Sequence, residues 1–292
     1  MKVVNITHSD VDGATCAILI KEFCRQKGFE CEVHKATVNN IDSIFKDVYN
    51  ESHDQLTIIT DVSFKNEPSL VETATNIVLI DHHGTANKSK VKKKLVKTDE
   101  GESATRLVYN YLTRLGTNFD EKFKKLADIA HDYDTYALTM ATSRAVNYLY
   151  YFYYFERFVS RFKNGFDKLT EDELLFLKCK RDQIKKALTN LKVTDIMENE
   201  VAFIIEEDNI NELAEHLYKE QNYKYVFIYS PKRSTLGMRS CPDAPIHCGE
   251  FLELFGGGGH LHSGGVQVKT MADIDKILDG FETVWYEFHP PF

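Results

Sequence analysis

The chain has 292 residues, of which 43% are hydrophobic and 27% are charged, with 36 Lys and Arg against 44 Asp and Glu. This composition is that of a folded protein, and the length suggests two domains, each long enough to bury its own core. The net charge of −8 argues against a general binder of duplex DNA, which requires a basic face.

The six cysteines are scattered and include no CxxC pair, which argues against a zinc ribbon or a disulfide scaffold. The first residues lack the pattern of a signal peptide, and no apolar run approaches the roughly 20 residues of a membrane span. We therefore expect a cytoplasmic protein with reduced thiols that does not bind membranes.

The first 140 residues alternate between β-rich and helical segments. Strands are predicted at residues 2–7, 30–36, 56–61 and 77–81, and helices at 13–26, 41–49, 103–115 and 122–130. The runs 56–61 and 77–81 are apolar almost throughout, which is typical of parallel strands covered on both faces. The prediction is an α/β domain with a parallel sheet over residues 1–146, with its chemistry at the carboxyl ends of the strands.

Residues 147–191 have a different character. Their first part is aromatic, and the second is charged and helical from about Thr170, where the sequence TEDE has the pattern of a capping box. We interpret this region as a helical connector, whose aromatic part we expect to pack against a domain rather than to stack on nucleobases.

Short β-rich runs return after the connector. Strands are predicted at 201–206, 225–229, 235–239 and 264–268, and helices at 210–220 and 274–287. Residues 192–292 are therefore predicted to form a second, smaller α/β domain.

Acidic and histidine side chains follow four separate apolar elements. The residues are His8, Asp10 and Asp12, then Asp61, then Asp81, His82 and His83, and finally Asp132 and Asp134. A turn or a helix N-cap would explain any one segment alone. All four together would bring mutually repelling carboxylates to one rim of the sheet, and divalent cations resolve that conflict. Mixed carboxylate and imidazole ligands favour Mn²⁺, with Mg²⁺ or Co²⁺ as alternatives.

The order and spacing of these segments resemble the DHH phosphoesterase superfamily, which includes the RecJ exonuclease, nano-RNases that also act on pAp, and family II pyrophosphatases. Residues 236–240 (LGMRS) and 255–265 (FGGGGHLHSGG) are similar to the associated substrate-binding domain, DHHA1. The resemblance implies a DHH catalytic domain, a helical connector and a DHHA1-like domain, with substrate bound in the cleft between the domains.

The resemblance also implies a site for two divalent cations. Asp10 and His8 would serve one ion and Asp12 the other, and Asp61 would bridge both. His82 would ligate one ion and Asp132 would complete the other, while Asp81 would orient an imidazole and His83 would touch the substrate. Asp132 and Asp134 are both available in the fourth segment, and Asp132 is preferred because it follows the apolar run most closely.

In the second domain, a guanidinium can hold a phosphate bidentately, and glycines let the backbone approach an anion or a base. The alternative interpretations are that Arg239 is an ordinary surface residue and that the glycine run forms a flexible hairpin. The predicted substrate-binding residues are Arg239, Ser240, Gly257, Gly258, Gly259 and His260.

The prediction is a metal-dependent phosphoesterase that acts on short oligonucleotides, dinucleotides or pAp, as a monomer or a homodimer. The acidic charge and the absence of an OB-type domain favour short substrates. The alternatives are a RecJ-like exonuclease on single-stranded DNA and a non-catalytic nucleotide-binding module. A pyrophosphatase is disfavoured because residues 201–268 contain few basic side chains.

The lysine-rich segment 88–97 is interpreted as solvated surface rather than as a basic patch that draws anionic substrates to the site.

Overall fold

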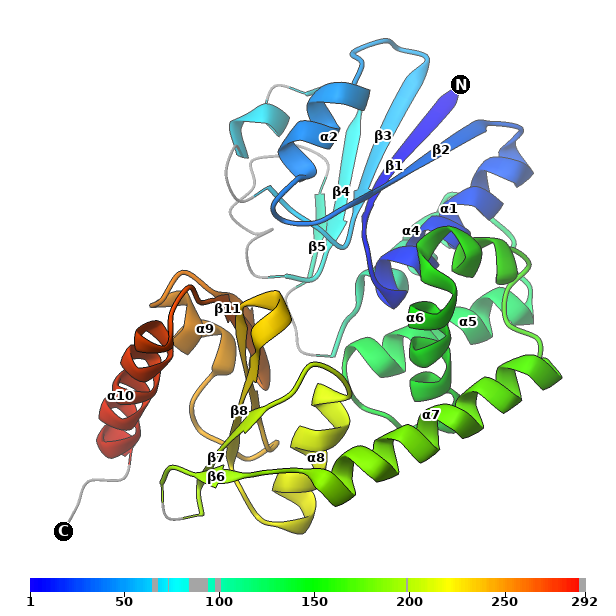
Figure 1. The fold of residues 1–292 in the computed structure, drawn as a ribbon. Coiled ribbons are helices and arrows are strands. Elements are labelled where there is room, and N and C mark those ends of the chain that lie inside the picture. Colours follow the sequence, from blue (N-terminus) through cyan, green and yellow to red (C-terminus); the bar gives the residue numbers. More distant parts are fainter. Residues whose placement is uncertain (65–67, 73, 84–93, 98–100, 198, 289–292) are drawn as a thin grey trace. The chain divides into compact units, whose positions relative to one another are not determined.

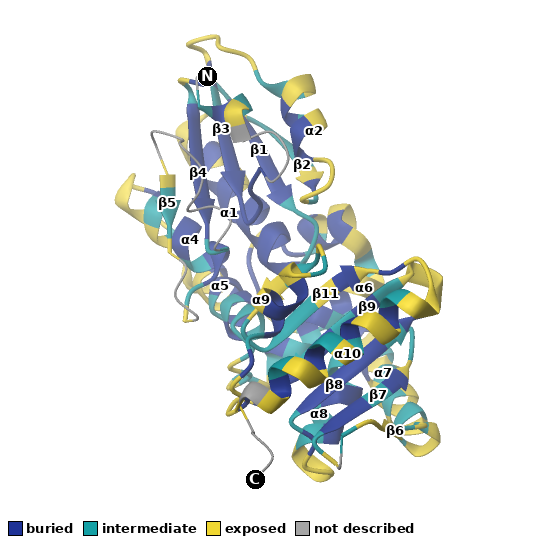
Figure 2. Ribbon diagram, turned by 90° about the vertical axis from the view of Figure 1, so that its left-hand side faces the viewer, coloured by how far each residue is buried: buried dark blue, intermediate teal, exposed yellow. Residues whose placement is uncertain are grey.

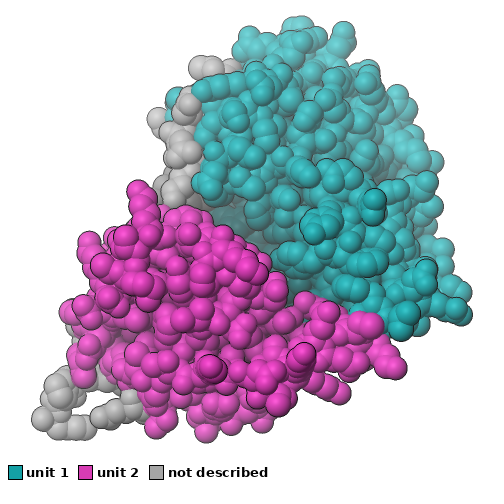
Figure 3. Space-filling model, in the orientation of Figure 1, with its two compact units in different colours: residues 1–177 teal, residues 178–292 magenta. Residues whose placement is uncertain are grey.

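The computed structural model describes residues 1–64, 68–72, 74–83, 94–97, 101–197 and 199–288 (Figure 1). These residues belong to two compact units, residues 1–177 and 178–292 (Figure 3). The division differs from the predicted boundaries at 146 and 191 because the aromatic half of the expected connector packs into the core of the first unit. Most of the lysine-rich segment 88–97 lies outside the described residues.

The first unit contains a five-stranded sheet of order β2-β1-β3-β4-β5, in which every pair is parallel, as the sequence predicts. Its strands are β1 (Lys2–His8), β2 (Glu30–Ala36), β3 (Gln55–Thr60), β4 (Ile77–Asp81) and β5 (Lys94–Val96). Its helices are α1 (Val11–Lys27), α2 (Ile41–Val48), η1 (Pro68–Val71), α4 (Ala104–Arg114), α5 (Glu121–Asp134), α6 (Ala141–Arg161) and α7 (Glu171–Asn190), the last of which continues into the second unit.

Both faces of this sheet are covered, which explains why its central strands are apolar (Figure 2). Val3, Ile58 and Val78 pack with α1, α4, α5 and α6 on one face. Val4 and Ile59 pack with α2 on the other face. The three central strands are thereby fixed side by side in parallel, with their carboxyl ends at the same edge.

The aromatic stretch of α6 packs into the core only in part. Tyr150, Phe155 and Phe158 are buried, whereas Tyr151 and Phe152 are exposed. Tyr154 breaks the helix with φ 57° and ψ 173°, and its side chain is exposed. Within the described residues, no helix is long and apolar enough to cross a membrane.

The second unit contains a six-stranded mixed sheet of order β10-β11-β9-β8-β7-β6. Its strands are β6 (Thr194–Asp195), β7 (Val201–Ile205), β8 (Tyr225–Ser230), β9 (Thr235–Ser240), β10 (Gly258–His260) and β11 (Ser263–Gln267), and its further helices are α8 (Ile210–Glu220), η2 (Pro231–Arg233), α9 (Cys248–Glu253) and α10 (Met271–Phe288). Only the β7–β8 pair is parallel among the described pairs. The helices α9 and α10 cover one face, and α8 with the end of α7 covers the other.

The start of α7 confirms the predicted capping box. The amide of Thr170 donates to Glu173 Oε2 at 2.7 Å, and the amide of Glu173 donates to Thr170 Oγ1 at 3.2 Å. The buried Glu173 carboxylate also accepts hydrogen bonds from Arg161 Nε at 2.7 Å and from the Tyr153 hydroxyl at 3.0 Å. Burial acts to raise the pKa of Glu173, but these hydrogen bonds hold it below its usual 4.5. One carboxylate therefore joins α6 to α7.

Glu173→Gln is expected to lower the free energy of unfolding at neutral pH by about 2–3 kcal/mol, because it removes a buried partner of Arg161. The lowered pKa means that the contribution of Glu173 is complete above pH 4.5 and is lost as the pH falls through the pKa of the folded state. Urea unfolding at several pH values should show the gap between wild type and variant closing in acid. Glu171→Gln, on the exposed side of the same turn, is the control. A difference in unfolding free energy between wild type and Glu173→Gln that stays the same at all pH values would contradict this account.

Candidate metal centre

The acidic and histidine side chains gather at the carboxyl edge of the parallel sheet. His8 ends β1, Asp61 directly follows β3, and Asp81 ends β4, just before His82 and His83. Because β1, β3 and β4 are adjacent, their ends meet, as the sequence analysis expects.

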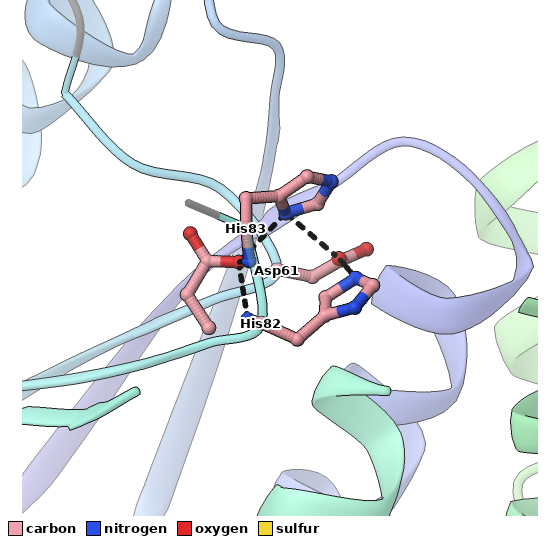
Figure 4. Close-up of side chains that lie close together, drawn as sticks. Asp61, His82 and His83 are labelled. Atoms are coloured by element: carbon pink, nitrogen blue, oxygen red, sulfur yellow. Dashed lines mark hydrogen bonds and ion pairs between the residues drawn. The ribbon is translucent and has the colours of Figure 1, made fainter. Parts of the chain in front are cut away.

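His82 lies among three carboxylates. Its Nε2 is 3.4 Å from Asp61 Oδ1, 3.5 Å from Asp134 Oδ2 and 4.0 Å from Asp12 Oδ2. Figure 4 shows the imidazoles of His82 and His83 turned toward the Asp61 carboxylate. Within the described residues, the ion pairs of these carboxylates are with histidines only.

The ligand atoms form groups that share residues. One group is His8, Asp10 and Asp61, a second is Asp12, His82 and Asp134, and a third is Asp61, Asp81, His82 and His83; within each group the ligand atoms lie within 4.8 Å of one another. Asp61 joins the first group to the third, and His82 joins the third to the second. The three groups therefore form one continuous cluster of potential ligands.

The turn between β1 and α1 is held tightly. Asp10 caps α1 by accepting a hydrogen bond from the amide of Gly13 at 2.9 Å, and its other oxygen is 2.8 Å from His8 Nδ1. A Cβ atom at position 13 would lie 2.2 Å from the carbonyl oxygen of His8, so only glycine fits there. The turn therefore presents His8 and Asp10 in one fixed orientation.

Asp12 is positioned by the N-terminus of α4. Its two carboxylate oxygens accept hydrogen bonds from the amides of Ala104 at 2.8 Å and Thr105 at 2.9 Å. Helix N-termini favour negative charge, so this contact lowers the cost of burying Asp12. Ser103 caps α4 by accepting a hydrogen bond from the amide of Arg106 at 3.2 Å.

Asp81 orients His83, in agreement with the role that the sequence resemblance implies. Asp81 Oδ1 is 2.8 Å from His83 Nδ1 and also accepts a hydrogen bond from the amide of His82 at 2.8 Å. The carboxylate therefore fixes both the backbone after β4 and the imidazole plane of His83.

Asp61 has an unusual backbone conformation. Its φ is 59°, in the left-handed region that few residues other than glycine adopt. Its amide still donates to the carbonyl of Ile80 at 3.0 Å, so the sheet holds the residue there. Such strain is often found at functional sites.

The fourth segment corrects the sequence prediction, because Asp134 rather than Asp132 joins the cluster. The Asp132 carboxylate instead accepts hydrogen bonds from the Thr139 amide, the Thr139 hydroxyl, the Met140 amide and the Ser143 hydroxyl. It thereby connects the end of α5 to the start of α6. Helical spacing alone does not distinguish the two residues, because Asp134 lies four residues after the buried Ala130 and Asp132 lies three after the buried Ile129.

The pKa shifts of the clustered side chains are those expected of a site that binds cations. Burial, reinforced by neighbouring carboxylates, raises the pKa of Asp61 and of Asp134 well above the usual 3.8. Burial, with the charge of His83, lowers the pKa of His82, which favours the neutral, metal-binding imidazole. Burial acts to lower the pKa of His83, but Asp81 raises it above 6.5.

Three buried carboxylate oxygens of the cluster, Asp61 Oδ2, Asp81 Oδ2 and Asp134 Oδ2, accept no hydrogen bond from the described part of the chain. Buried oxygens without a donor are costly, and a bound cation would satisfy them. Carboxylates and imidazoles are the ligands that Mn²⁺ accepts readily. The residues at this edge therefore fit divalent cations.

The predicted substrate-binding residues of the second unit lie near one end of its sheet. Arg239 on β9 pairs with Ser263 on β11, which pairs with His260 on β10. Arg239 Nε donates to Asn211 Oδ1 at 2.9 Å, and Ser240 Oγ is 2.9 Å from His262 Nδ1.

The glycine run has a packing role that the sequence analysis did not identify. A Cβ at Gly257 would lie 2.5 Å from the carbonyl oxygen of Gly265, and one at Gly259 would lie 2.3 Å from that of Ser263. A Cβ at Gly258 would meet no atom within 4 Å. Close packing of the β10–β11 hairpin thus accounts for two of these glycines and leaves Gly258 as the position where a ligand contact would explain the residue.

Residues 2–142 match the sequence model of the DHH family, N-terminal domain. Comparison with curated proteins found no match. Among solved structures, PggH, a pGpG-specific phosphodiesterase from Vibrio cholerae, is 14% identical with a TM-score of 0.57, and the match covers 97% of each chain.

Two further structures have the same fold. An exopolyphosphatase-related protein from Bacteroides fragilis is 13% identical with a TM-score of 0.56, over 99% of this chain and 92% of that protein. RecJ from Thermus thermophilus in complex with Mn²⁺ is 16% identical with a TM-score of 0.59, over 99% of this chain and 52% of RecJ. At these identities the likeness shows that the fold is shared across both units.

Asp134→Asn is expected to stabilise the metal-free protein at neutral pH and to remove much of the stabilisation that Mn²⁺ gives to wild type. The raised pKa values mean that wild type loses stability as the pH rises from about 4 through the pKa values of the folded state, because the folded protein must then release bound protons. Thermal unfolding in EDTA should therefore show the advantage of the variant growing from acidic to neutral pH, to about 2–4 °C. The control is Asp47→Asn, at an exposed position. An equal gain in thermal stability in this control would contradict the view that repulsion between buried carboxylates destabilises the metal-free protein.

Asp132→Asn is expected to have the opposite effect on the metal-free protein. Its amide group would face hydrogen-bond donors, which should lower the free energy of unfolding by about 1–3 kcal/mol. Urea unfolding in EDTA measures this change. If Asp132→Asn were as stable as wild type while Asp134→Asn lost stability, the assignment of the two residues would be reversed.

Proposed function

We propose that this chain, whose residues 2–142 match the DHH family model, is a divalent-metal-dependent phosphoesterase that hydrolyses phosphate ester bonds of short oligonucleotides, dinucleotides or pAp. The observation that carries this proposal is the position of Asp61, a buried, strained carboxylate shared between groups of potential ligands. A carboxylate that bridges two cations needs this position.

The cation ligands in this proposal come from four segments. His8, Asp10 and Asp61 would hold one divalent cation, and Asp12, His82 and Asp134 would hold the second. Asp61 Oδ1, which is 3.4 Å from His82 Nε2, would contribute to the second site as well. When bound, such cations activate water and neutralise the charge of a phosphoryl group. Mn²⁺ is the proposed ion, and the fold likeness to RecJ solved with Mn²⁺ is consistent with it.

The protein groups around the cations would orient the substrate. Asp81 holds Nδ1 of His83, so Nε2 is the nitrogen that would meet a phosphate oxygen or protonate the leaving oxygen. The raised pKa of His83 favours the protonated imidazole that either role requires. In the second unit, Arg239, Ser240, Gly258 and His260 are proposed to bind a nucleotide.

A short substrate is favoured by two observations. The net charge of −8 is unfavourable for a long polyanion, whose binding depends on many basic contacts. The match to PggH, whose structure is described as that of a pGpG-specific phosphodiesterase, covers 97% of both chains.

The full chain with Mn²⁺ is expected to hydrolyse bis-p-nitrophenyl phosphate and at least one of pAp, a linear dinucleotide or a two- to five-residue RNA. EDTA should abolish turnover and added Mn²⁺ should restore it. Asp61→Asn should reduce kcat by about 10³-fold or more, because the loss of a bridging ligand disrupts both cation sites. Asp128→Asn, at an exposed ion pair on α5, is the control and should retain activity. Full activity in Asp61→Asn would refute the bridging role.

The fold likeness to RecJ supports one alternative, a single-stranded DNA exonuclease. An exonuclease that contacts many phosphates should lose activity steeply between low and moderate salt on long DNA. A short-substrate enzyme should instead be fastest on a few nucleotides and change little with salt. Measuring rates against DNA length at several salt concentrations separates the two activities.

A further inference from the structure

The sheet of the first unit has one long open edge. Its edge strand β2 pairs only with β1 among the described strands (Figure 1). This strand has seven residues, contains no proline or glycine, and keeps an unbroken register with β1. The other edge strands, β5, β6 and β10, have only two or three residues each. Short edge strands protect a sheet from pairing with another chain, and β2 lacks this protection.

The outward-facing backbone groups of β2 follow from its pairing with β1. The amide of Glu30 donates to the carbonyl of Met1 at 3.2 Å, so Glu30 bonds toward β1. In a paired strand, the backbone groups of successive residues point to opposite sides. Cys31, Val33 and Lys35 therefore direct their N–H and C=O groups away from β1. Within the described residues these outward groups have no hydrogen-bond partner, so they are available to another strand.

A pocket of about 420 Å³ lies beside this open edge. Its apolar wall consists of Val33 on β2, Ile44 on α2, and Phe155 and Val159 on α6. Because α6 packs on one face of the sheet and α2 on the other, the pocket extends around the edge of β2. When a peptide adds a strand to a sheet edge, main-chain hydrogen bonds give affinity and such pockets give specificity for its side chains.

The charged side chains of the pocket leave one positive charge for a partner. They include Lys21 on α1, Lys35 on β2 and Glu156 on α6. Lys35 Nζ is 2.8 Å from Glu156 Oε1, which joins the Lys35 side chain to α6. His34 also lines the pocket, and its Nε2 is 2.7 Å from Glu32 Oε1. Lys21 is exposed and forms no ion pair with any described residue, so a carboxylate is the complementary group.

We propose that the open edge of β2 binds an extended segment of a partner protein, which adds a sixth strand to the sheet. The backbone of the segment would exchange hydrogen bonds with Cys31, Val33 and Lys35. An apolar side chain of the segment would fill the pocket. A carboxylate two residues away lies on the same face of a strand and would meet Lys21. This docking site is separate from the proposed hydrolysis and does not depend on it.

A second copy of this chain fits the edge less well than an acidic segment. Cys31 and Val33 pack toward the α1 and α6 side of the sheet, and Lys35 contacts α6 on the same side. Two β2 strands paired with each other would present only these three side chains on that side. A second β2 would therefore bring a lysine, and no carboxylate, to the side on which Lys21 lies.

The test begins with a phage-displayed library of random segments of about seven residues, the length of β2, selected on the immobilised full chain. The selected segments should carry an apolar residue with Asp or Glu two positions away. A synthetic peptide of the selected sequence should bind the full chain in solution. N-methylation of one alternate set of its amides should raise Kd about tenfold or more, because that set donates to β2. N-methylation of the other set should leave Kd within about twofold.

Two protein variants test the same contacts from the other side. Val33→Pro removes an N–H that gives no hydrogen bond to β1, so the sheet should persist while Kd rises about tenfold or more. Lys21→Gln should raise Kd about two- to fivefold, as expected of an exposed ion pair. Lys27→Gln, at an exposed position of α1 outside the pocket, is the matched control and should leave Kd unchanged. If Val33→Pro failed to fold in a thermal unfolding assay, the two N-methylated peptides would still decide.

Three results would overturn the proposal. The first is a selection that enriches no segment of this pattern, and the second is an equal Kd for both N-methylated peptides. The third concerns the choice of partner, and light scattering of the full chain measures it. A dimer that Val33→Pro dissociates would assign the edge of β2 to a second copy of this chain instead.

Discussion

The burial of mutually repelling carboxylates at one edge of a parallel sheet is the constraint on which the site depends. The adjacency of β1, β3 and β4 leaves the side chains after these strands no room to separate. Asp61 shows the cost most clearly, because it is buried, has a raised pKa and adopts a left-handed backbone conformation. Apolar packing on both faces of the sheet offsets this cost. Bound cations would relieve the repulsion between the carboxylates, and this relief would contribute to their affinity.

The acids of this region fall into two kinds. Asp12 and Asp132 accept two or more hydrogen bonds from backbone amides or hydroxyls, which stabilise their charge within the protein. Asp61 and Asp134 each keep a buried oxygen without a hydrogen bond from the described residues. The hydrogen bonds of Asp132 join two helix ends, and those of Asp12 fix a carboxylate that also lies in the group with His82 and Asp134. The oxygens of Asp61 and Asp134 that lack a hydrogen bond are the ones that a bound cation would satisfy.

The fold does not by itself select a substrate. The compared structures include a dinucleotide phosphodiesterase, an exopolyphosphatase-related protein and an exonuclease, all at 13–16% identity. A shared scaffold of this kind places the metal centre, and the residues around it decide what is bound.

The sequence by itself determined the parallel sheet, the convergence of three of the four acidic segments and the capping box of α7, because local periodicity, strand ends and short-range hydrogen bonds control these features. The tertiary structure decided between Asp132 and Asp134. Two residues apart on a helix, their side chains point to nearly opposite sides, so the packing of α5 selects the one that meets His82. Packing likewise decided that α6 belongs to the first unit and that Gly257 and Gly259 admit no side chain. Each of these depends on contacts between distant residues, which no local pattern contains.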